Sequence, residues 1–226
     1  LGQETAQQPA VTQLRIGAPP FVAQGYLPEV LSRLIAEHPH VRVQLQEERV
    51  PLLVECLLAG QLDALITSYP TELPEAAGQP LRYEKLFDAA FTVIAPADHP
   101  AGHARTCDWE YLARQRWVLP TRSSMLRRMM EEVFRRESVM SPTPVIESTS
   151  PFTNLQLVKA GLGISAVPSA SLRVAPASLG VREVRAVPGI STGPVALIYR
   201  GAVANPRVAL LRSTLGLAAS GETPAP

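Results

Sequence analysis

The stretch PLLVECLLAGQLDALI, residues 51–66, decides the fold because it encodes one helix and the strand that follows it. Pro51 suits the first turn of a helix, and Gly60 is typical of the position where a helix ends. The short apolar run over 61–66 then predicts a buried strand. We compare the rest of the chain with this pattern of a helix followed by a strand.

The same order of elements stands immediately upstream. Residues 13–17 alternate as a short strand before Ala18-Pro19-Pro20-Phe21 interrupts it. Apolar residues at helical spacing predict an amphipathic helix over 27–37, and alternation over 41–46 predicts a half-buried strand. Strand, helix, strand, helix, strand is typical of a parallel α/β sheet.

A second series of elements follows and predicts a second lobe. This lobe is expected to contain strands at 116–120, 143–148 and 163–167 and helices at 125–137 and 151–160. The segment at 81–87 precedes an apolar run at 89–95, and the remaining expected elements are strands at 181–187 and 195–199 and a closing helix at 205–217. The stretch from 98 to 109 is expected to be a polar loop.

Length and charge exclude several classes of protein. The chain has 226 residues, of which 46% are hydrophobic and 18% charged, which allows two lobes of about a hundred residues each. Its net charge of +1 lacks the basic excess of a nucleic-acid binder. No apolar run approaches the ~18 residues of a membrane span, and the polar N-terminus does not read as a signal peptide. We therefore expect a cytoplasmic protein that does not contact membranes.

Residues for catalysis or metal binding form no recognisable pattern. Cys56 and Cys107 stand in unrelated contexts, so we interpret them as reduced packing residues rather than as a disulfide. Nucleophile elbows, P-loops, zinc-helix motifs and dinucleotide turns are absent from the sequence. The histidines, interpreted as loop residues rather than metal ligands or general bases, are His38, His40, His99 and His103. The sequence thus predicts no enzyme, metal or cofactor.

Small-molecule binding has more support. In open α/β sheets, ligands bind beyond the carboxyl ends of strands, where helix N-termini present free N–H groups. Four such junctions can be located in this sequence. Their candidate ligand-binding residues are Ala18, Pro19, Pro20, Phe21, Thr67, Ser68, Thr121, Ser123, Ser124, Ser148 and Ser150.

Three of these four junctions are rich in hydroxyl groups, which suit a small polar or anionic metabolite held between two lobes. Arg122 would add a charge partner for a carboxylate. The alternative is that Ser123 or Ser124, together with Ser150, serves only as a helix N-cap.

The helix at 125–137 also invites a nucleic-acid interpretation because it carries four arginines. Its charges are spaced to pair at i, i+4: Arg127 with Glu131, Arg128 with Glu132, Glu131 with Arg135, and Glu132 with Arg136. Since the glutamates cancel much of the positive field, we expect a solvated, self-paired helix face.

An ordered series of segments resembles the effector-binding (co-inducer) region of LysR-type transcriptional regulators, which have the type 2 periplasmic-binding-protein fold. The segments are LRIG at 14–17, LPEVL at 27–31, HPHV at 38–41, LLAGQLDA at 57–64, APADHP at 95–100, and LVKAGLGI at 157–164 running into Val167-Pro168. Each segment is weakly specific, whereas their order and spacing over residues 13–215 are specific.

The resemblance implies two Rossmann-like α/β lobes joined by two crossover strands. Lobe I would comprise 13–95 with 190–217, and lobe II would comprise 96–189. A linker remnant at 1–12 and a tail at 218–226 would flank them. The four junctions would then contact an effector in the cleft between the lobes.

The resemblance also implies how the protein would work. The helix at 27–37 and the strand at 41–46 resemble the surface through which such domains form a homodimer, or a tetramer. The DNA-reading helix-turn-helix, the only part expected to contact DNA, would precede Leu1. Effector binding would change lobe closure and thereby the spacing of the DNA-reading heads.

One departure concerns the first junction. Relatives often carry Ser or Thr there, whereas this chain has Pro19-Pro20-Phe21, which supplies an aromatic face for a ring in the ligand. Two alternatives keep the same fold: a solute-binding protein of a transporter, and an enzyme such as a dehydratase or deaminase. A signal peptide upstream would favour the first, and an acid/base pair or a cofactor-bearing cysteine in the cleft would favour the second.

Overall fold

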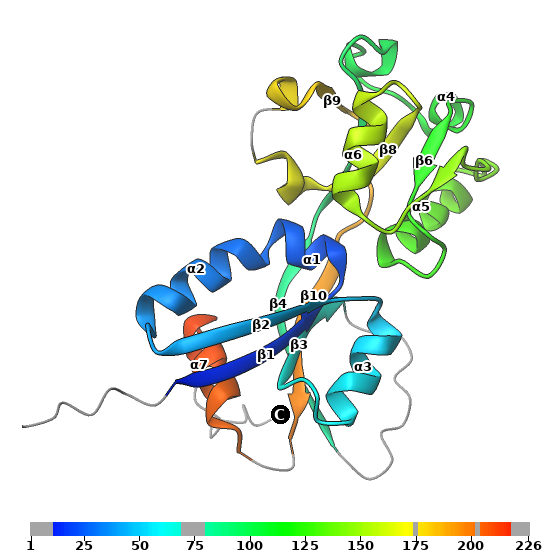
Figure 1. Cartoon of the computed structure of the whole chain (residues 1–226). Helices are drawn as coiled ribbons and strands as arrows, with labels where there is room; N and C mark the ends of the chain where they lie inside the picture. The colour runs from blue at the N-terminus through cyan, green and yellow to red at the C-terminus, as the bar shows by residue number, and fades with distance from the viewer. Residues whose placement is uncertain (1–10, 69–79, 174–175, 202–203, 218–226) are drawn as a thin grey trace, which may run out of the picture.

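The computed structural model describes residues 11–68, 80–173, 176–201 and 204–217, which form two lobes, each built on a five-stranded sheet (Figure 1). The predicted tail at 218–226 and all but the last two residues of the predicted linker remnant at 1–12 lie outside the described residues.

The first sheet has the strand order β2-β1-β3-β10-β4. Its strands are β1 (Thr12–Ala18), β2 (Val41–Glu47), β3 (Ala64–Ser68), β4 (Leu81–Ala89) and β10 (Gly193–Arg200). The helices of this lobe are α1 (Pro20–Gly25), α2 (Leu27–Glu37), α3 (Val50–Leu58) and α7 (Pro206–Thr214). β1 pairs in parallel with β2 and β3, whereas β10 runs antiparallel to β3 and β4, so the sheet is mixed rather than parallel throughout.

The second sheet has the strand order β7-β6-β8-β5-β9 and is also mixed. Its strands are β5 (Phe91–Pro96), β6 (Trp117–Leu119), β7 (Ile146–Glu147), β8 (Ile164–Pro168) and β9 (Val181–Val184). The α-helices of this lobe are α4 (Trp109–Ala113), α5 (Met125–Arg136) and α6 (Pro151–Lys159). Short 3₁₀ helices lie at Pro100–Gly102, Ser169–Leu172 and Pro176–Leu179.

The chain passes between the lobes twice, between β4 and β5 and between β9 and β10 (Figure 1). The first passage comes earlier than the expected boundary at residue 95. β5 already pairs with β8 and β9 of the second sheet, so the lobes change at Ala90. The apolar run at 89–95 predicts a strand but carries no information about the sheet that it joins.

Two local expectations need correction. The expected loop at 98–109 leads into α4, which begins at Trp109, where Asp108 Oδ1 accepts a hydrogen bond from Tyr111 N at 2.7 Å and thereby caps this helix. A five-residue helix is too short to show helical periodicity in the sequence. The expected loop at 18–21 is likewise the junction between the end of β1 and the start of α1 at Pro20.

Buried polar contacts hold the first lobe together beside its apolar core. Asp63 is almost fully buried and accepts hydrogen bonds from Arg15 N at 2.8 Å and from Arg15 Nη2 at 3.0 Å. Arg207, in α7, lies 3.4 Å from the same carboxylate. This cluster ties β1, the start of β3 and α7 to one another.

Candidate ligand-binding cleft

A cavity of about 320 Å³ lies between the two lobes, and segments of both line it. From lobe I it is lined by Pro19, Pro20, Phe21, Arg49, Val50, Pro51 and Ser68. From lobe II it is lined by Pro120, Thr121, Ser123, Ser124, Met125, Leu126, Arg128, Thr149, Pro151 and Asn154. The volume is at the lower end of the range for small-molecule sites.

All four predicted junctions reach this cavity or lie beside it. The candidates that line it are Pro19, Pro20, Phe21, Ser68, Thr121, Ser123 and Ser124. The candidates that do not line it are Ala18, Thr67, Ser148 and Ser150, although their neighbours Thr149 and Pro151 do.

Each candidate outside the cavity has a local reason. Ala18 and Thr67 are fully buried, and successive residues of a strand such as β3 point to opposite faces, so Ser68 and not Thr67 reaches the cleft. Ser148 Oγ accepts a hydrogen bond from Ser150 N at 3.3 Å. Ser150 Oγ accepts one from Thr153 N at 3.3 Å, so this serine caps α6, as the N-cap alternative predicted.

Besides the short α1, which begins at Pro20, three helices begin at the cleft and direct their N-termini towards it. These are α3 at Val50, α5 at Met125 and α6 at Pro151. Ser124 both lines the cavity and caps α5, because its Oγ accepts a hydrogen bond from Arg127 N at 3.1 Å. The positive ends of these helix dipoles favour a negatively charged ligand, although the first N–H groups of α6, those of Phe152 and Thr153, already donate to Gln24 and Ser150.

Two cationic side chains that the sequence analysis did not single out line the cavity from opposite lobes. Arg49 immediately precedes α3, and Arg128 lies in the first turn of α5, where its Nη1 donates to Ser123 O at 3.2 Å. Among the residues that the structure describes, no aspartate or glutamate lines the cavity. Arg49 was predictable, because it follows β2 and precedes a helix, like the four chosen junctions.

Asn154 is a third residue that the sequence analysis missed. It lies in α6, is only 2% exposed and lines the cavity. Among the described residues, no group donates a hydrogen bond to its Oδ1. The sequence offered little signal for it, because a polar residue one turn into a helix is usually solvated.

Arg127 differs from the expected solvated arginine. It is 1% exposed, and its guanidinium donates to Pro120 O at 3.1 Å, to Glu131 at 2.9 Å and to Glu147 at 3.2 Å. Arg127 therefore holds the segment between β6 and α5 in place behind the cleft. The predicted ion pair between Arg127 and Glu131 is present, but its arginine side chain is buried.

The other predicted pairs of α5 differ in part. Glu132 pairs with Arg136 at 2.7 Å as expected, and it also pairs with Arg135 at 2.5 Å. Arg128 bonds to the Ser123 carbonyl group instead of pairing with Glu132. Arg122, expected to serve a carboxylate ligand, lines a separate depression of about 490 Å³ that it shares with Arg127.

Helix α1 bridges the lobes beside the cleft (Figure 1). Gln24 Oε1 accepts a hydrogen bond from Phe152 N of α6 at 3.1 Å, and Gln24 Nε2 donates to Glu47 at 3.1 Å. Next to it, Glu29 of α2 forms an ion pair with Arg173 of lobe II at 2.6 Å. These contacts, with the two crossover segments, set the angle between the lobes.

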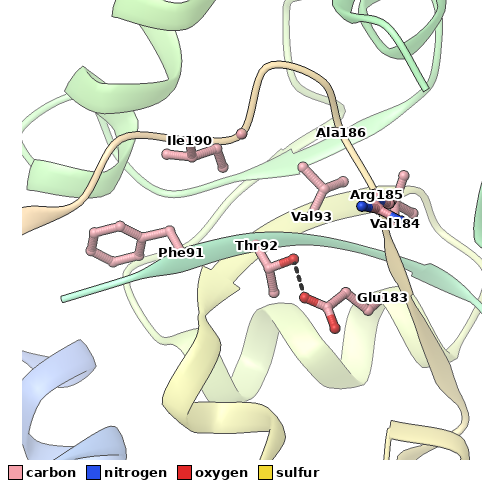
Figure 2. Close-up of a pocket in the computed structure, with 9 residues that line it drawn as sticks. Phe91, Thr92, Val93, Glu183, Val184, Arg185, Ala186 and Ile190 are labelled. Atoms are coloured by element: carbon pink, nitrogen blue, oxygen red, sulfur yellow. Dashed lines mark hydrogen bonds between the residues drawn. The ribbon is translucent and has the colours of Figure 1, made fainter. Parts of the chain in front are cut away.

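A larger depression of about 430 Å³ lies in lobe II next to the return crossover (Figure 2). β5 and β9 line it together with Gly189 and Ile190 of the crossover. Thr92 donates a hydrogen bond to Glu183 at 2.7 Å across its floor, so these polar groups satisfy each other. Because no strand of the first sheet reaches this depression, it is not enclosed by both lobes as the cleft is.

The two cysteines lie in different lobes and are both free. Cys56 is half-buried in α3, and Cys107 is buried in lobe II, where desolvation and the neighbouring Asp108 raise the pKa of its thiol. Among the described residues, no three His, Cys, Asp or Glu side chains gather closely enough to hold a metal ion. None of the helices within the described ranges is both long and apolar enough to cross a bilayer.

Comparisons with known proteins agree with this architecture. A family model described as "LysR substrate binding domain" matches residues 7–218. A probable hydrogen peroxide-inducible genes activator of Streptomyces viridosporus is 27% identical over 171 residues, which cover 76% of this chain and 53% of the relative. The HTH-type transcriptional regulator GalR of Pseudomonas putida is 30% identical over 135 residues, covering 60% of this chain and 33% of that protein.

Solved structures share the fold. The CcmR regulatory domain of Synechocystis PCC6803 in complex with 2-PG superposes with a TM-score of 0.76 at 19% identity, covering 91% of this chain and 96% of that one. The chain thus spans about half or less of the length of the two relatives above, whereas it matches almost all of an isolated regulatory domain.

Proposed function

Because the chain belongs to the LysR substrate binding domain family, we propose that it is the ligand-sensing part of a transcriptional regulator and that the cleft between its lobes is the sensing site. The observation that carries this proposal is the cavity lined by both lobes. A ligand that touches both walls binds more tightly when the lobes are closed, so its binding favours closure.

The lobe angle is the quantity that the ligand would control. The lobes meet through two crossover segments and the contacts of α1 and α2, so closure moves the first sheet as one body relative to the second. Coupling of this kind typically amounts to about 1–3 kcal/mol. In the whole protein, this movement would alter the spacing of DNA-reading heads attached upstream, which alone would contact DNA.

The remaining expectations are part of the same proposal. The chain would work in the cytoplasm as a homodimer or tetramer, without catalysis and without a cofactor. Relatives named as transcriptional regulators favour this role over that of a transporter's solute-binding protein. That the CcmR regulatory domain was solved in complex with 2-PG is in keeping with an effector bound by the domain.

A thermal-shift screen of small acids, sugars and aromatic compounds tests the proposal. A compound that binds only the folded state raises the melting temperature in a concentration-dependent way. Ser123→Trp, which places an indole at the cleft, should abolish the shift, whereas Thr106→Trp, at an exposed position of lobe II outside the cavity, should preserve it. A shift that survives Ser123→Trp unchanged would place the ligand elsewhere and refute the sensing site.

A further inference from the structure

We infer that the depression beside the return crossover is a second ligand site and that it takes an α-amino acid with an apolar side chain. In this site Arg185 would bind the carboxylate group of the ligand, and Glu183 would bind its ammonium group. The site lies outside the cleft and does not rest on the sensing function proposed above. Three observations carry the inference: a strand ladder that stops at the depression, two opposite charges that do not pair, and an apolar wall beside them.

The first observation is the interrupted pairing between β5 and β9. Their antiparallel ladder ends at the pair formed by Val93 and Val184. Ala186, two residues further on, forms a bridge with Cys107 instead, and its N–H group donates to Val184 O at 2.9 Å. The two chains separate at this point, and the depression of about 430 Å³ opens between them (Figure 2). Its volume lies within the range of small-molecule sites.

The end of the ladder leaves the backbone of Phe91 without a strand partner on this edge. Ser169 N donates to Ala90 O at 2.9 Å, so the carbonyl group of Ala90 faces β8. Successive residues of a strand direct their N–H and C=O groups to opposite edges, so those of Phe91 face the edge that β9 has left. A donor and an acceptor of the main chain therefore stand at the depression, where an amino acid supplies an acceptor and a donor.

The second observation is a pair of opposite charges that line the same depression without meeting. Glu183 and Arg185 are both exposed, and among the described residues neither takes part in an ion pair. Thr92 Oγ1 donates to Glu183 Oε1 at 2.7 Å, which orients the carboxylate group but leaves its charge without a cation. A zwitterion offers an opposite charge to each side chain, and such charge-assisted hydrogen bonds are stronger than those between neutral groups.

The third observation is the apolar wall next to these charges. Ala186 and Ile190 are half-buried and line the depression, and Figure 2 shows Ile190 on the crossover opposite β5, which carries Phe91. Val93 and Val184 close the floor and are only 1% exposed, so they shape the depression rather than contact a ligand. A branched aliphatic side chain against Ile190 would remove apolar surface from water, which selects for an apolar amino acid.

Four probes separate these features. L-leucine carries an ammonium group, a carboxylate group and a branched apolar side chain; 4-methylpentanoate lacks the ammonium group, 3-methylbutylamine lacks the carboxylate group, and glycine lacks the side chain. We expect isothermal titration calorimetry on the 226-residue chain to show the tightest binding for leucine, with each of the other probes about tenfold weaker.

Two variants assign the charges to residues. Arg185→Gln should weaken leucine and 4-methylpentanoate about tenfold and leave 3-methylbutylamine unchanged. Glu183→Gln, whose amide oxygen can still accept from Thr92, should weaken leucine and 3-methylbutylamine about tenfold but not 4-methylpentanoate. The matched controls are Arg105→Gln and Glu137→Gln, at exposed positions of lobe II outside the depression, and neither should alter any affinity.

A third variant separates this site from the cleft. Ser123 lines the cleft and not the depression, so Ser123→Trp should bind leucine with the affinity of the wild type. Loss of leucine binding in this variant would place the amino acid in the cleft and overturn the second site. Because Glu183 and Arg185 are exposed, their variants should keep the melting temperature of the wild type, so a weaker affinity reports on the ligand and not on folding.

Three other results would overturn the inference. Failure of leucine, isoleucine and phenylalanine to bind at about 10 mM, far above usual ligand affinities, would refute the class of ligand. Equal affinity for leucine in the wild type and in both charge variants would remove the roles of Arg185 and Glu183. Binding of 4-methylpentanoate as tight as that of leucine would show that the ammonium group is not recognised. None of these results bears on the sensing function of the cleft, which the separate screen tests.

Discussion

At the scale of single residues, Asp63 is the clearest case of a side chain whose chemistry the fold depends on. Burial acts to raise the pKa of this carboxyl group, but hydrogen bonds from Arg15 and the charge of Arg207 outweigh it and hold the pKa below its ordinary value of 3.8. A carboxyl group whose pKa is lower in the folded state than in the unfolded state stabilises the fold at pH values above its unfolded-state pKa. That stabilisation is lost as the pH falls through the folded value.

We therefore predict that Asp63→Asn lowers the free energy of unfolding by about 3 kcal/mol at pH 7, since it leaves Arg15 without its buried partner. Urea denaturation at several pH values measures this difference, which should shrink as the pH falls below 3.8. Asp88→Asn is the control, because Asp88 pairs with Lys85 at the surface and should change stability by less than about 1 kcal/mol. A pH-independent difference would contradict the role of the ionised carboxylate.

The cysteines lead to a second prediction at this scale. Thiolates react with peroxide, and the raised pKa of Cys107 disfavours its thiolate, while Cys56 lies in the other lobe. We expect moderate hydrogen peroxide to form no disulfide within the chain, as judged by mass spectrometry after alkylation. The double variant Cys56→Ser/Cys107→Ser should still show a ligand-induced increase in melting temperature. An intramolecular disulfide in the treated wild type would contradict this separation.

At the scale of elements, α2 and β2 present apolar side chains to solvent. Ile35 of α2 is 50% exposed and Leu45 of β2 is 40% exposed. β2 also stands at the end of the strand order of its sheet, so its outer backbone groups are available for pairing. These features fit the expected homodimer surface and have no evident role within one chain.

We predict that Ile35→Asp together with Leu45→Lys converts a dimer of this chain into a monomer in analytical ultracentrifugation. Because both side chains are already half-exposed, the melting temperature of the monomer should change little. Val145→Asp, at an equally exposed apolar position of lobe II, is the control and should leave the dimer intact. A double variant that still sediments as a dimer would assign the interface to another surface.

At the scale of the whole molecule, the sequence predicted what depends on local pattern and missed what depends on tertiary placement. Periodicity located α2, α3 and α5, and the rule for strand ends brought Ser68, Thr121 and Ser123 to one cavity. It could not show that β5 belongs to the second sheet, because strand pairing leaves no mark in an apolar run. It missed Asn154 because burial of a helix residue depends on the lobe that packs over it.

The angle between the lobes is a property of the whole molecule, and side chains of α1 and α2 contact the second lobe beside the cleft. Gln24 bonds to Phe152 N across the lobes, and Glu29 pairs with Arg173 beside it. Both partners of the ion pair are more than half exposed, so solvent screens the pair and it adds little to the stability of the fold. For an equilibrium between open and closed lobes, however, even a small difference in contact energy between the two states shifts their populations.

We therefore predict that Gln24→Ala with Glu29→Gln increases the radius of gyration in small-angle X-ray scattering and weakens binding of any ligand held by both lobes. The fold itself should remain intact, because the altered contacts lie between the lobes rather than within a core. High salt should act on the wild type in the same direction, since it screens the ion pair between Glu29 and Arg173. Glu110→Gln removes a comparable exposed ion pair with Arg114 inside lobe II and should change neither measurement. Identical scattering and affinity in the double variant and the wild type would show that the crossover segments alone set the lobe angle.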